Sequence, residues 1–152
     1  MREIVILGST GSIGLQALEI VAANPGKFKV VGLASGSKNL QLLLSQAKKF
    51  NVPIVGTTAD TSAIKDGIAG VHVIDGATAA AQIASLPCDV VLNGINGSIG
   101  LEPTLAALAA GNLVALANKE SLVAGGDLVM AYGRDRIIPV DSEELNSPLS
   151  PI

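Results

Sequence analysis

Short apolar runs alternate along the chain with longer stretches in which apolar residues recur every three or four positions. The runs have the length of buried strands, and the periodic stretches are typical of amphipathic helices. Strands are predicted at residues 3–7, 28–34, 53–55, 71–74, 89–92, 113–117 and 137–140. Helices are predicted at residues 13–21, 40–47, 77–86, 101–110 and 119–132, the last one weakened by two internal glycines.

Regular strand–helix alternation predicts βαβ units. We therefore expect an α/β, Rossmann-like, doubly wound fold with a mostly parallel sheet and helices on both faces. The pattern is lost near the end, where SPLSPI carries two prolines and no periodicity. One ordered domain is predicted for residues 1–143, followed by an irregular tail at residues 144–152.

Composition and charge narrow the function classes. Apolar residues make up 49% and charged residues 15% of the 152 positions, which argues against disorder. A net charge of −3, without a basic aromatic-rich patch, favours no nucleic-acid partner. No apolar run is long enough to cross a bilayer, so no membrane association is expected. The single cysteine, Cys88, suits a reducing compartment, and a cytoplasmic location is expected.

The stretch GSTGSIG at residues 8–14 lies between a predicted buried strand and a predicted helix. This is the context that a dinucleotide fingerprint requires, because glycines let the backbone approach a pyrophosphate and the helix start attracts anions. The alternative is a tight turn without a ligand. Hydroxyl donors are expected here from Ser9, Thr10 and Ser12.

The end of the second predicted strand decides between NAD and NADP. An NAD site usually carries a carboxylate for the ribose 2′-hydroxyl about 20 residues after the glycines. Here no carboxylate occurs between Glu19 and Asp60, and the strand end reads ASGSKN at residues 34–39. Hydroxyls and Lys38 favour a 2′-phosphate, so we expect NADP(H). The alternative for Lys38 is an ordinary exposed loop lysine.

A second stretch, GINGSIG at residues 94–100, nearly repeats the first. Because one loop of a doubly wound sheet wraps the pyrophosphate, we interpret this later loop as lying on the nicotinamide side of the same crevice. Ile99 is expected to face the core as Ile13 does, and Glu102 and Pro103 suit the first turn of the next helix. A turn selected for packing alone is the alternative.

Two further segments carry charges at predicted strand ends. In ANKES, Asn118 suits a helix N-cap and Glu120 suits the positive helix end. Lys119 opposes the helix dipole there, which is explained if it holds an anionic substrate. In PVDSE, Asp141 and Glu143 are two residues apart, so an extended backbone points both carboxylates to one side, as metal ligands require. A polar strand end is the alternative.

Taken in order, LGSTGSIG, SGSKN, GLEPTLAALAAG, LANKESLVAGG and IIPVDSE resemble the N-terminal, NADPH-binding domain of the 1-deoxy-D-xylulose 5-phosphate reductoisomerase family. The resemblance covers residues 2 to about 143. It implies NADPH as cofactor, Mg²⁺ or Mn²⁺ as metal, and 1-deoxy-D-xylulose 5-phosphate as substrate. It also implies isomerisation and reduction to 2-C-methyl-D-erythritol 4-phosphate, in non-mevalonate isoprenoid biosynthesis, by a homodimeric full-length enzyme.

The resemblance also implies roles for individual residues. The pyrophosphate would be held by Thr10, Gly11, Ser12 and Ile13, and the adenosine 2′-phosphate by Gly36, Ser37, Lys38 and Asn39. Further cofactor contacts are implied for Asn118 and Glu120. Lys119 is expected to act in catalysis, and substrate contacts are implied for Lys119, Ser142 and Glu143. The implied metal ligands are Asp141 and Glu143.

The family motif continues D-S-E-H, whereas this sequence has Glu144 and then diverges. The family's catalytic domain lies beyond this point, so these residues alone are expected to bind NADPH without catalysing. A rival hypothesis is a stand-alone NADP(H)-binding sensor or partner module. A semialdehyde dehydrogenase type is disfavoured because Cys88, in P-C-D before a strand, is a poor nucleophile. His72 is expected to face solvent or to pack structurally.

Overall fold

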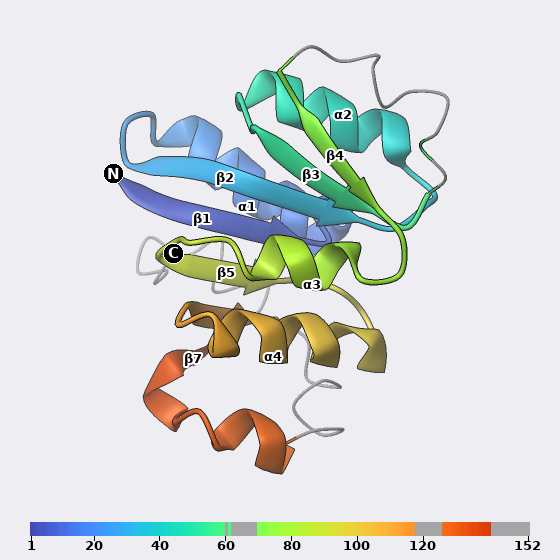
Figure 1. The fold of residues 1–152 in the computed structure, drawn as a ribbon. Coiled ribbons are helices and arrows are strands. Elements are labelled where there is room, and N and C mark those ends of the chain that lie inside the picture. The colour runs from blue at the N-terminus through green and yellow to red at the C-terminus, as the bar shows by residue number, and fades with distance from the viewer. Residues whose placement is uncertain (60, 62–69, 118–125, 141–152) are drawn as a thin grey trace.

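A seven-stranded parallel sheet forms the centre of the molecule (Figure 1). The computed structural model describes residues 1–59, 61, 70–117 and 126–140. Along the sheet the strand order is β4-β3-β2-β1-β5-β6-β7. The strands are β1 (Arg2–Leu7), β2 (Phe28–Ser35), β3 (Ile54–Thr57), β4 (His72–Asp75), β5 (Val90–Asn93), β6 (Leu113–Leu116) and β7 (Ile137–Pro139).

The helices cover both faces of this sheet. Helices α1 (Ser12–Ala23) and α2 (Leu40–Lys49) pack on one face, and α3 (Ala79–Ala84) and α4 (Leu101–Ala109) pack on the other. In Figure 1, α1 lies behind the sheet and α3 in front of it. The chain first builds outward from β1 to β4 and then returns to build outward from β5 to β7. The switch point of this doubly wound fold therefore lies between β1 and β5.

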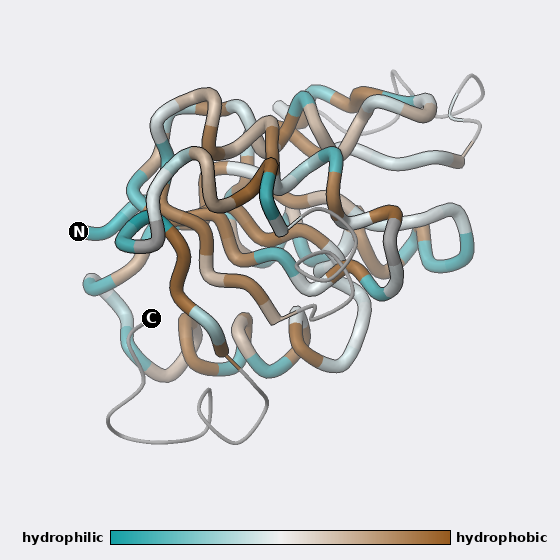
Figure 2. Tube along the Cα trace, turned by 90° about the horizontal axis from the view of Figure 1, so that it is seen from below, coloured by the Kyte–Doolittle hydropathy of each residue, from teal (hydrophilic) through white to brown (hydrophobic). Residues whose placement is uncertain are grey.

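Alternation along the strands divides the apolar core into two layers. On β1, Ile4 and Ile6 face the layer beneath α1 and α2, whereas Val5 and Leu7 face the layer beneath α3 and α4. All four are at most 1% exposed. Strands that are apolar on both faces belong to parallel sheets covered on both sides. Figure 2 shows these strands as brown segments inside more hydrophilic loops.

The predicted elements agree with this architecture. Each predicted strand is present, and the helices predicted at 13–21, 40–47, 77–86 and 101–110 begin and end within two residues of the observed ones. Of the helix predicted at 119–132, the structure describes residues 126–130 as helical. The predicted irregular tail lies outside the described residues, so the domain boundary stays a prediction. No helix in the described ranges has the length and apolarity to cross a bilayer.

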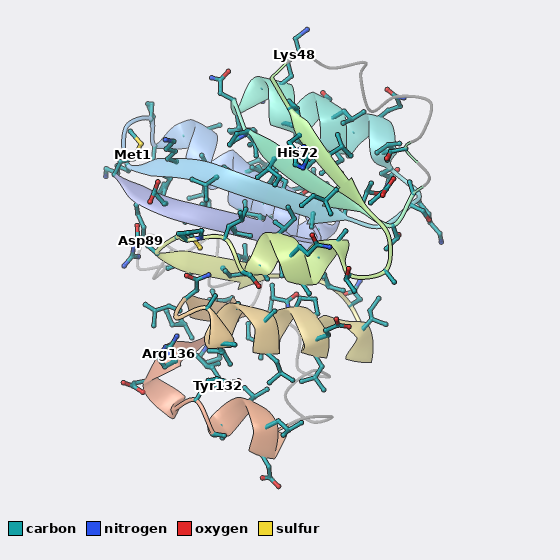
Figure 3. All side chains as sticks on the ribbon, viewed as in Figure 1. Met1, Lys48, His72, Asp89, Tyr132 and Arg136 are labelled. Atoms are coloured by element: carbon teal, nitrogen blue, oxygen red, sulfur yellow. The ribbon has the colours of Figure 1, made fainter. Side chains whose placement is uncertain are left out.

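A polar clamp joins the second layer at the end of the sheet away from the glycine loops. The Asn112 side-chain amide donates to the carbonyls of Ala84 and Leu86, at 3.0 and 2.9 Å. Arg136, labelled in Figure 3, donates to the carbonyls of Leu108 and Asn112 at 3.2 and 2.9 Å. These bonds engage carbonyls in the last turns of α3 and α4 and in the segments that follow them. The clamp thus fixes both helices relative to β7.

Candidate functional site

Three loops meet where the carboxyl ends of β1, β2 and β5 lie side by side. The backbone N–H of Gly8 donates to the carbonyl of Ala34 at 2.8 Å, which ties the first glycine loop to the end of β2. The N–H of Gly94 donates to the carbonyl of Leu7 at 2.9 Å, which ties the second loop to the end of β1. The fold thus places both glycine stretches and the SGSKN turn at its switch point.

Two glycines of the first loop are required by the fold itself. Gly8 has a φ of +76°, and a Cβ there would lie 2.9 Å from the carbonyl carbon of Gly94. A Cβ on Gly14 would overlap the carbonyl oxygen of Gly8 and the backbone of Ser9. These contacts let α1 start immediately behind the loop, as the fingerprint requires.

The third glycine, Gly11, is not required by the fold. Its φ of −84° and ψ of 177° suit any residue, and a Cβ there would meet only the Gly8 carbonyl oxygen, at an ordinary 3.4 Å. Gly11 is the exposed N-cap of α1, and no side chain caps this helix. The first-turn N–H groups are therefore left for solvent or an anion, and Gly11 leaves room for close approach.

The predicted hydroxyl donors of this loop differ in accessibility. Ser12 is exposed and Thr10 is partly exposed, so both can reach a bound anion, and Ile13 is partly buried against the core. The prediction for Ser9 is wrong, because this residue is 0% exposed and its hydroxyl faces the interior. Its carbonyl instead accepts a hydrogen bond of 2.9 Å from the side chain of Gln46 on α2. The Ser9 carbonyl therefore helps to hold the loop in place against α2.

The turn after β2 is open to solvent. The four residues predicted to hold the 2′-phosphate are all exposed: Gly36, Ser37, Lys38 and Asn39. A Cβ on Gly36 would meet nothing within 4 Å, so this glycine too leaves its backbone accessible. The buried hydroxyl of Thr57, at the end of the neighbouring strand β3, donates to the Gly36 carbonyl at 3.3 Å. Asn39 occupies the N-cap position of α2, although its side chain makes no capping hydrogen bond.

The second glycine loop has a different geometry from the first despite the repeated G-S-I-G. Gly97 has a φ of +79°, whereas the equivalent Gly11 has a φ of −84°. The 3₁₀ turn η1 (Ser98–Gly100) then precedes α4, whereas α1 begins directly at Ser12. Ile99 is consequently 76% exposed, so the prediction that it faces the core like Ile13 is wrong. The extra turn changes the phase of the chain before the helix starts.

Buried polar side chains support this second loop. The side-chain amide of Asn93 donates to the carbonyl of Gly100 at 2.9 Å and to the Thr104 hydroxyl at 2.7 Å. Its oxygen accepts from the N–H of Ile95 at 3.1 Å. No sequence motif predicts a role for Asn93, Thr104, Gln46 or Thr57. Their signal in the sequence is a polar residue at a position that the strand or helix period assigns to the core.

A cleft of about 420 Å³ opens between the three loops and the starts of α3 and α4. Its lining comes from Gly8 of the first glycine loop, the second glycine loop, the end of β2 and the small residues of α3, and so combines backbone with an apolar wall. Of the described residues predicted to hold the cofactor, Gly36 lines this cleft, whereas Thr10, Gly11, Ser12 and Ile13 do not. The lining residues are Gly8, Ala34, Ser35, Gly36, Thr58, Ala77, Ala80, Ala81, Gly94, Ile95, Asn96, Ile99, Glu102 and Pro103. A larger depression of about 750 Å³ beside α2 contains none of the predicted site residues.

Gly94, Ile95 and Asn96 share this cleft with Ser35, at the end of β2, and with Gly36, the first residue of the turn predicted to hold the 2′-phosphate. The nicotinamide-side placement of the second loop stays a prediction. Glu102 and Pro103 do occupy the first turn of α4, as expected.

The remaining predicted residues lie outside the described part of the chain. These are Asn118, Lys119 and Glu120 of ANKES and Asp141, Ser142 and Glu143 of DSE. The described residues contain no group of three or more His, Cys, Asp or Glu side chains that would hold a metal ion. The metal-ligand and substrate assignments therefore stay predictions.

The cysteine and the histidine lie away from the cleft. Cys88 precedes β5, beside Asp89, which Figure 3 places near Met1 at the amino end of the sheet. Burial, with a smaller effect of Asp89 and Glu3, raises the pKa of the Cys88 thiol to about 11. The thiol is thus protonated at neutral pH and is a poor nucleophile, as expected. His72 is exposed on β4 (Figure 3), which confirms that it faces solvent.

Comparison with known proteins gives a consistent result. A sequence profile of the 1-deoxy-D-xylulose 5-phosphate reductoisomerase family matches residues 4–126. The reductoisomerase of Beutenbergia cavernae is 55% identical over 150 residues, covering 93% of this chain and 38% of that protein. This chain therefore spans well under half the length of that relative.

Solved structures show the same likeness. The reductoisomerase of Zymomonas mobilis in complex with NADPH is 36% identical, with a TM-score of 0.84 over 93% of this chain and 39% of that one. A reductoisomerase in complex with NADPH, fosmidomycin and magnesium is 35% identical, with a TM-score of 0.84 over 97% of this chain and 38% of that one. The profile match, the sequence identity and the shared fold agree, and the chain belongs to the 1-deoxy-D-xylulose 5-phosphate reductoisomerase family.

Proposed function

We propose that these 152 residues are the NADPH-binding part of a 1-deoxy-D-xylulose 5-phosphate reductoisomerase. The observation that carries the proposal is the pair of glycines, Gly11 and Gly36, that the fold does not need. Both leave their backbone accessible at the carboxyl ends of β1 and β2, where dinucleotides bind in doubly wound folds. A pyrophosphate beside Gly11 would meet the uncapped start of α1.

The same geometry supports NADPH over NADH. The turn Gly36–Asn39 carries no carboxylate that would repel a 2′-phosphate. Lys38 is exposed within the turn, and α2 begins directly after it with no acidic residue in its first turn. A 2′-phosphate there would gain a cation and a helix start together. Solved relatives with the same fold are complexes with NADPH.

The whole reaction belongs to a longer protein in this proposal. The NADPH bound here would supply hydride for the reduction that follows isomerisation of 1-deoxy-D-xylulose 5-phosphate. We assign Lys119, Ser142 and Glu143 to substrate contacts, with catalysis assigned to Lys119, and Asp141 and Glu143 to a divalent metal. The matched relatives are more than twice as long as this chain. We therefore expect the 152 residues alone to bind cofactor without turning over substrate.

A paired calorimetric titration with NADPH and NADH, without metal, tests the proposal. We expect clear preference for NADPH, and we expect Lys38→Ala to weaken NADPH binding by about three- to tenfold, because a solvent-exposed ion pair contributes about 1 kcal/mol. NADH binding should not change. Lys48→Ala is the matched control, because Lys48 is an exposed lysine in the last turn of α2, at the opposite end of the helix from the turn that contains Lys38 (Figure 3). Equal binding of the two nucleotides, or binding of neither, would overturn the assignment.

A further inference from the structure

The end of β5 carries a buried amide, Asn93, after three apolar residues. Asn93 and Thr104 are both 0% exposed. The two hydrogens of the Asn93 amide go to the Gly100 carbonyl and the Thr104 hydroxyl, and its oxygen accepts from the N–H of Ile95. The Thr104 hydroxyl also donates to the Gly100 carbonyl at 2.9 Å. The pair thus forms a satisfied network between the strand end and the first turns of α4.

This network is not needed to fill space. In the near repeat, Leu7 occupies the position equivalent to Asn93, and it is also 0% exposed. An apolar residue is therefore compatible with a strand end in this sheet, and it avoids the cost of burying an amide. What Asn93 adds is a direct hold on the loop that follows, because it bonds to Ile95 near the loop's start and to Gly100 at its end.

The loop between these two bonds lines the cleft. Gly94, Ile95 and Asn96 face the same cavity as Ser35 and Gly36. The backbones of Gly8 and Gly94 also lie close together, since a Cβ on Gly8 would be 2.9 Å from the carbonyl carbon of Gly94. The position of the second loop therefore sets the width of the cleft and the space around the first loop.

We propose that Asn93 and Thr104 are positioning residues that hold the 94–97 loop in its binding geometry before the cofactor arrives. The inference rests on the proposed function, since it concerns the same cleft. A preformed loop spares the ordering cost that a mobile one adds to binding, so losing the hold lowers the population of the competent cleft and with it the apparent affinity. Because the loop shares its cavity with Ser35 and Gly36, the loss extends to the adenosine half of the cofactor, beyond the nicotinamide side on which the loop is predicted to lie.

Thr104→Val tests the inference, because valine keeps the shape and removes only the hydroxyl. Thr104→Ser is the conservative counterpart that retains it. Ile4→Val serves as a stability control, since it removes one buried methylene on β1 at the end remote from the cleft. We would measure dissociation constants of NADPH and of 2′,5′-ADP by calorimetry. Amide hydrogen exchange at Ile95 without nucleotide would report on the loop directly.

Thr104→Val should weaken both NADPH and 2′,5′-ADP by about tenfold, the equivalent of about one buried hydrogen bond. It should also lower the protection of the Ile95 amide, whereas Thr104→Ser and Ile4→Val should bind within about twofold of the unmodified chain. Equal binding by Thr104→Val and Ile4→Val, or an unchanged affinity for 2′,5′-ADP, would overturn the inference. Failure of the unmodified chain to bind NADPH would instead refute the proposed function, on which the inference depends.

Discussion

Gly11→Ala and Gly14→Ala should separate the demands of the fold from those of the ligand. The two glycines are three residues apart in one motif, yet only Gly14 is enclosed by backbone. A methyl group on Gly14 would overlap the Gly8 carbonyl and the Ser9 backbone, neither of which is a flexible side-chain end. We expect Gly14→Ala to lower the free energy of unfolding by about 3 kcal/mol or more, at the upper end of overpacking costs.

Gly11→Ala should leave the free energy of unfolding within about 0.5 kcal/mol of its original value. Its backbone angles are allowed for alanine, and the new methyl would make one ordinary contact of 3.4 Å with the Gly8 carbonyl oxygen. Restricting the unfolded chain stabilises the variant by about 0.4–1 kcal/mol, and losing glycine at an N-cap costs a few tenths or more. These effects nearly cancel.

NADPH binding, unlike the free energy of unfolding, should be sensitive to Gly11→Ala. A methyl group at Gly11 would take up space at the N-cap of α1, where we propose that the pyrophosphate binds. Displacing the phosphate weakens at least one charge-assisted hydrogen bond, which contributes about 2 kcal/mol, or about thirtyfold in affinity. Urea unfolding and calorimetric titration with NADPH measure the two effects on the same samples. Unchanged NADPH affinity in Gly11→Ala, or a stability loss equal to that of Gly14→Ala, would refute the reasoning.

Two further predictions concern residues remote from the cleft. Because the pKa of Cys88 is raised from 9.0 to about 11, its alkylation by iodoacetamide at pH 8 should be about 100-fold slower than that of an unperturbed thiol, and a rate like that of the unfolded chain would contradict this. The contribution of the buried, protonated thiol to the free energy of unfolding is fully present below pH 9 and is lost as the pH rises through about 11. Asn112→Ala removes two hydrogen bonds to helix-end carbonyls, so it should lower the free energy of unfolding by about 2 kcal/mol while NADPH affinity stays the same; a change in affinity would show that the clamp is coupled to the cleft.

Most of the fold follows from the sequence because the signals are local. A parallel strand covered on both faces is a short continuous apolar run, and runs such as residues 3–7 and 89–92 meet that description. Helix ends are also marked locally, as at Asn24-Pro25-Gly26. With strands and helices in strict alternation, right-handed crossovers leave few topologies.

The supports of the cleft do not follow from the sequence because they depend on distant pairs. Gln46 reaches the Ser9 carbonyl across 37 positions, and Thr57 reaches Gly36 across 21. In the sequence each is only a polar residue within an apolar pattern, with nothing to identify its partner. Whether a polar residue at such a position is buried and bonded depends on the strand order, which is a property of the whole sheet.

The near repeat of the two glycine stretches shows where local likeness ends. Strand β1 connects through α1 to β2 on one side of the switch point, and β5 connects through α4 to β6 on the other. Because both crossovers keep the same hand while running in opposite directions, their helices must lie on opposite faces of the sheet. The residue before each first glycine faces the layer of α3 and α4, so Leu7 lies on the face opposite its own helix, whereas Asn93 faces its own helix.

The Asn93 side chain can therefore donate to both Thr104 and Gly100, and Leu7, at the equivalent position of β1, makes no such bonds. The same reversal requires a different path from strand to helix, and the 3₁₀ turn that provides it leaves Ile99 exposed at the cleft. One sequence motif thus yields two structures: a tight loop from which α1 begins directly, and a longer loop with a 3₁₀ turn that lines the cleft. Sheet topology, which no short motif encodes, assigns the two roles.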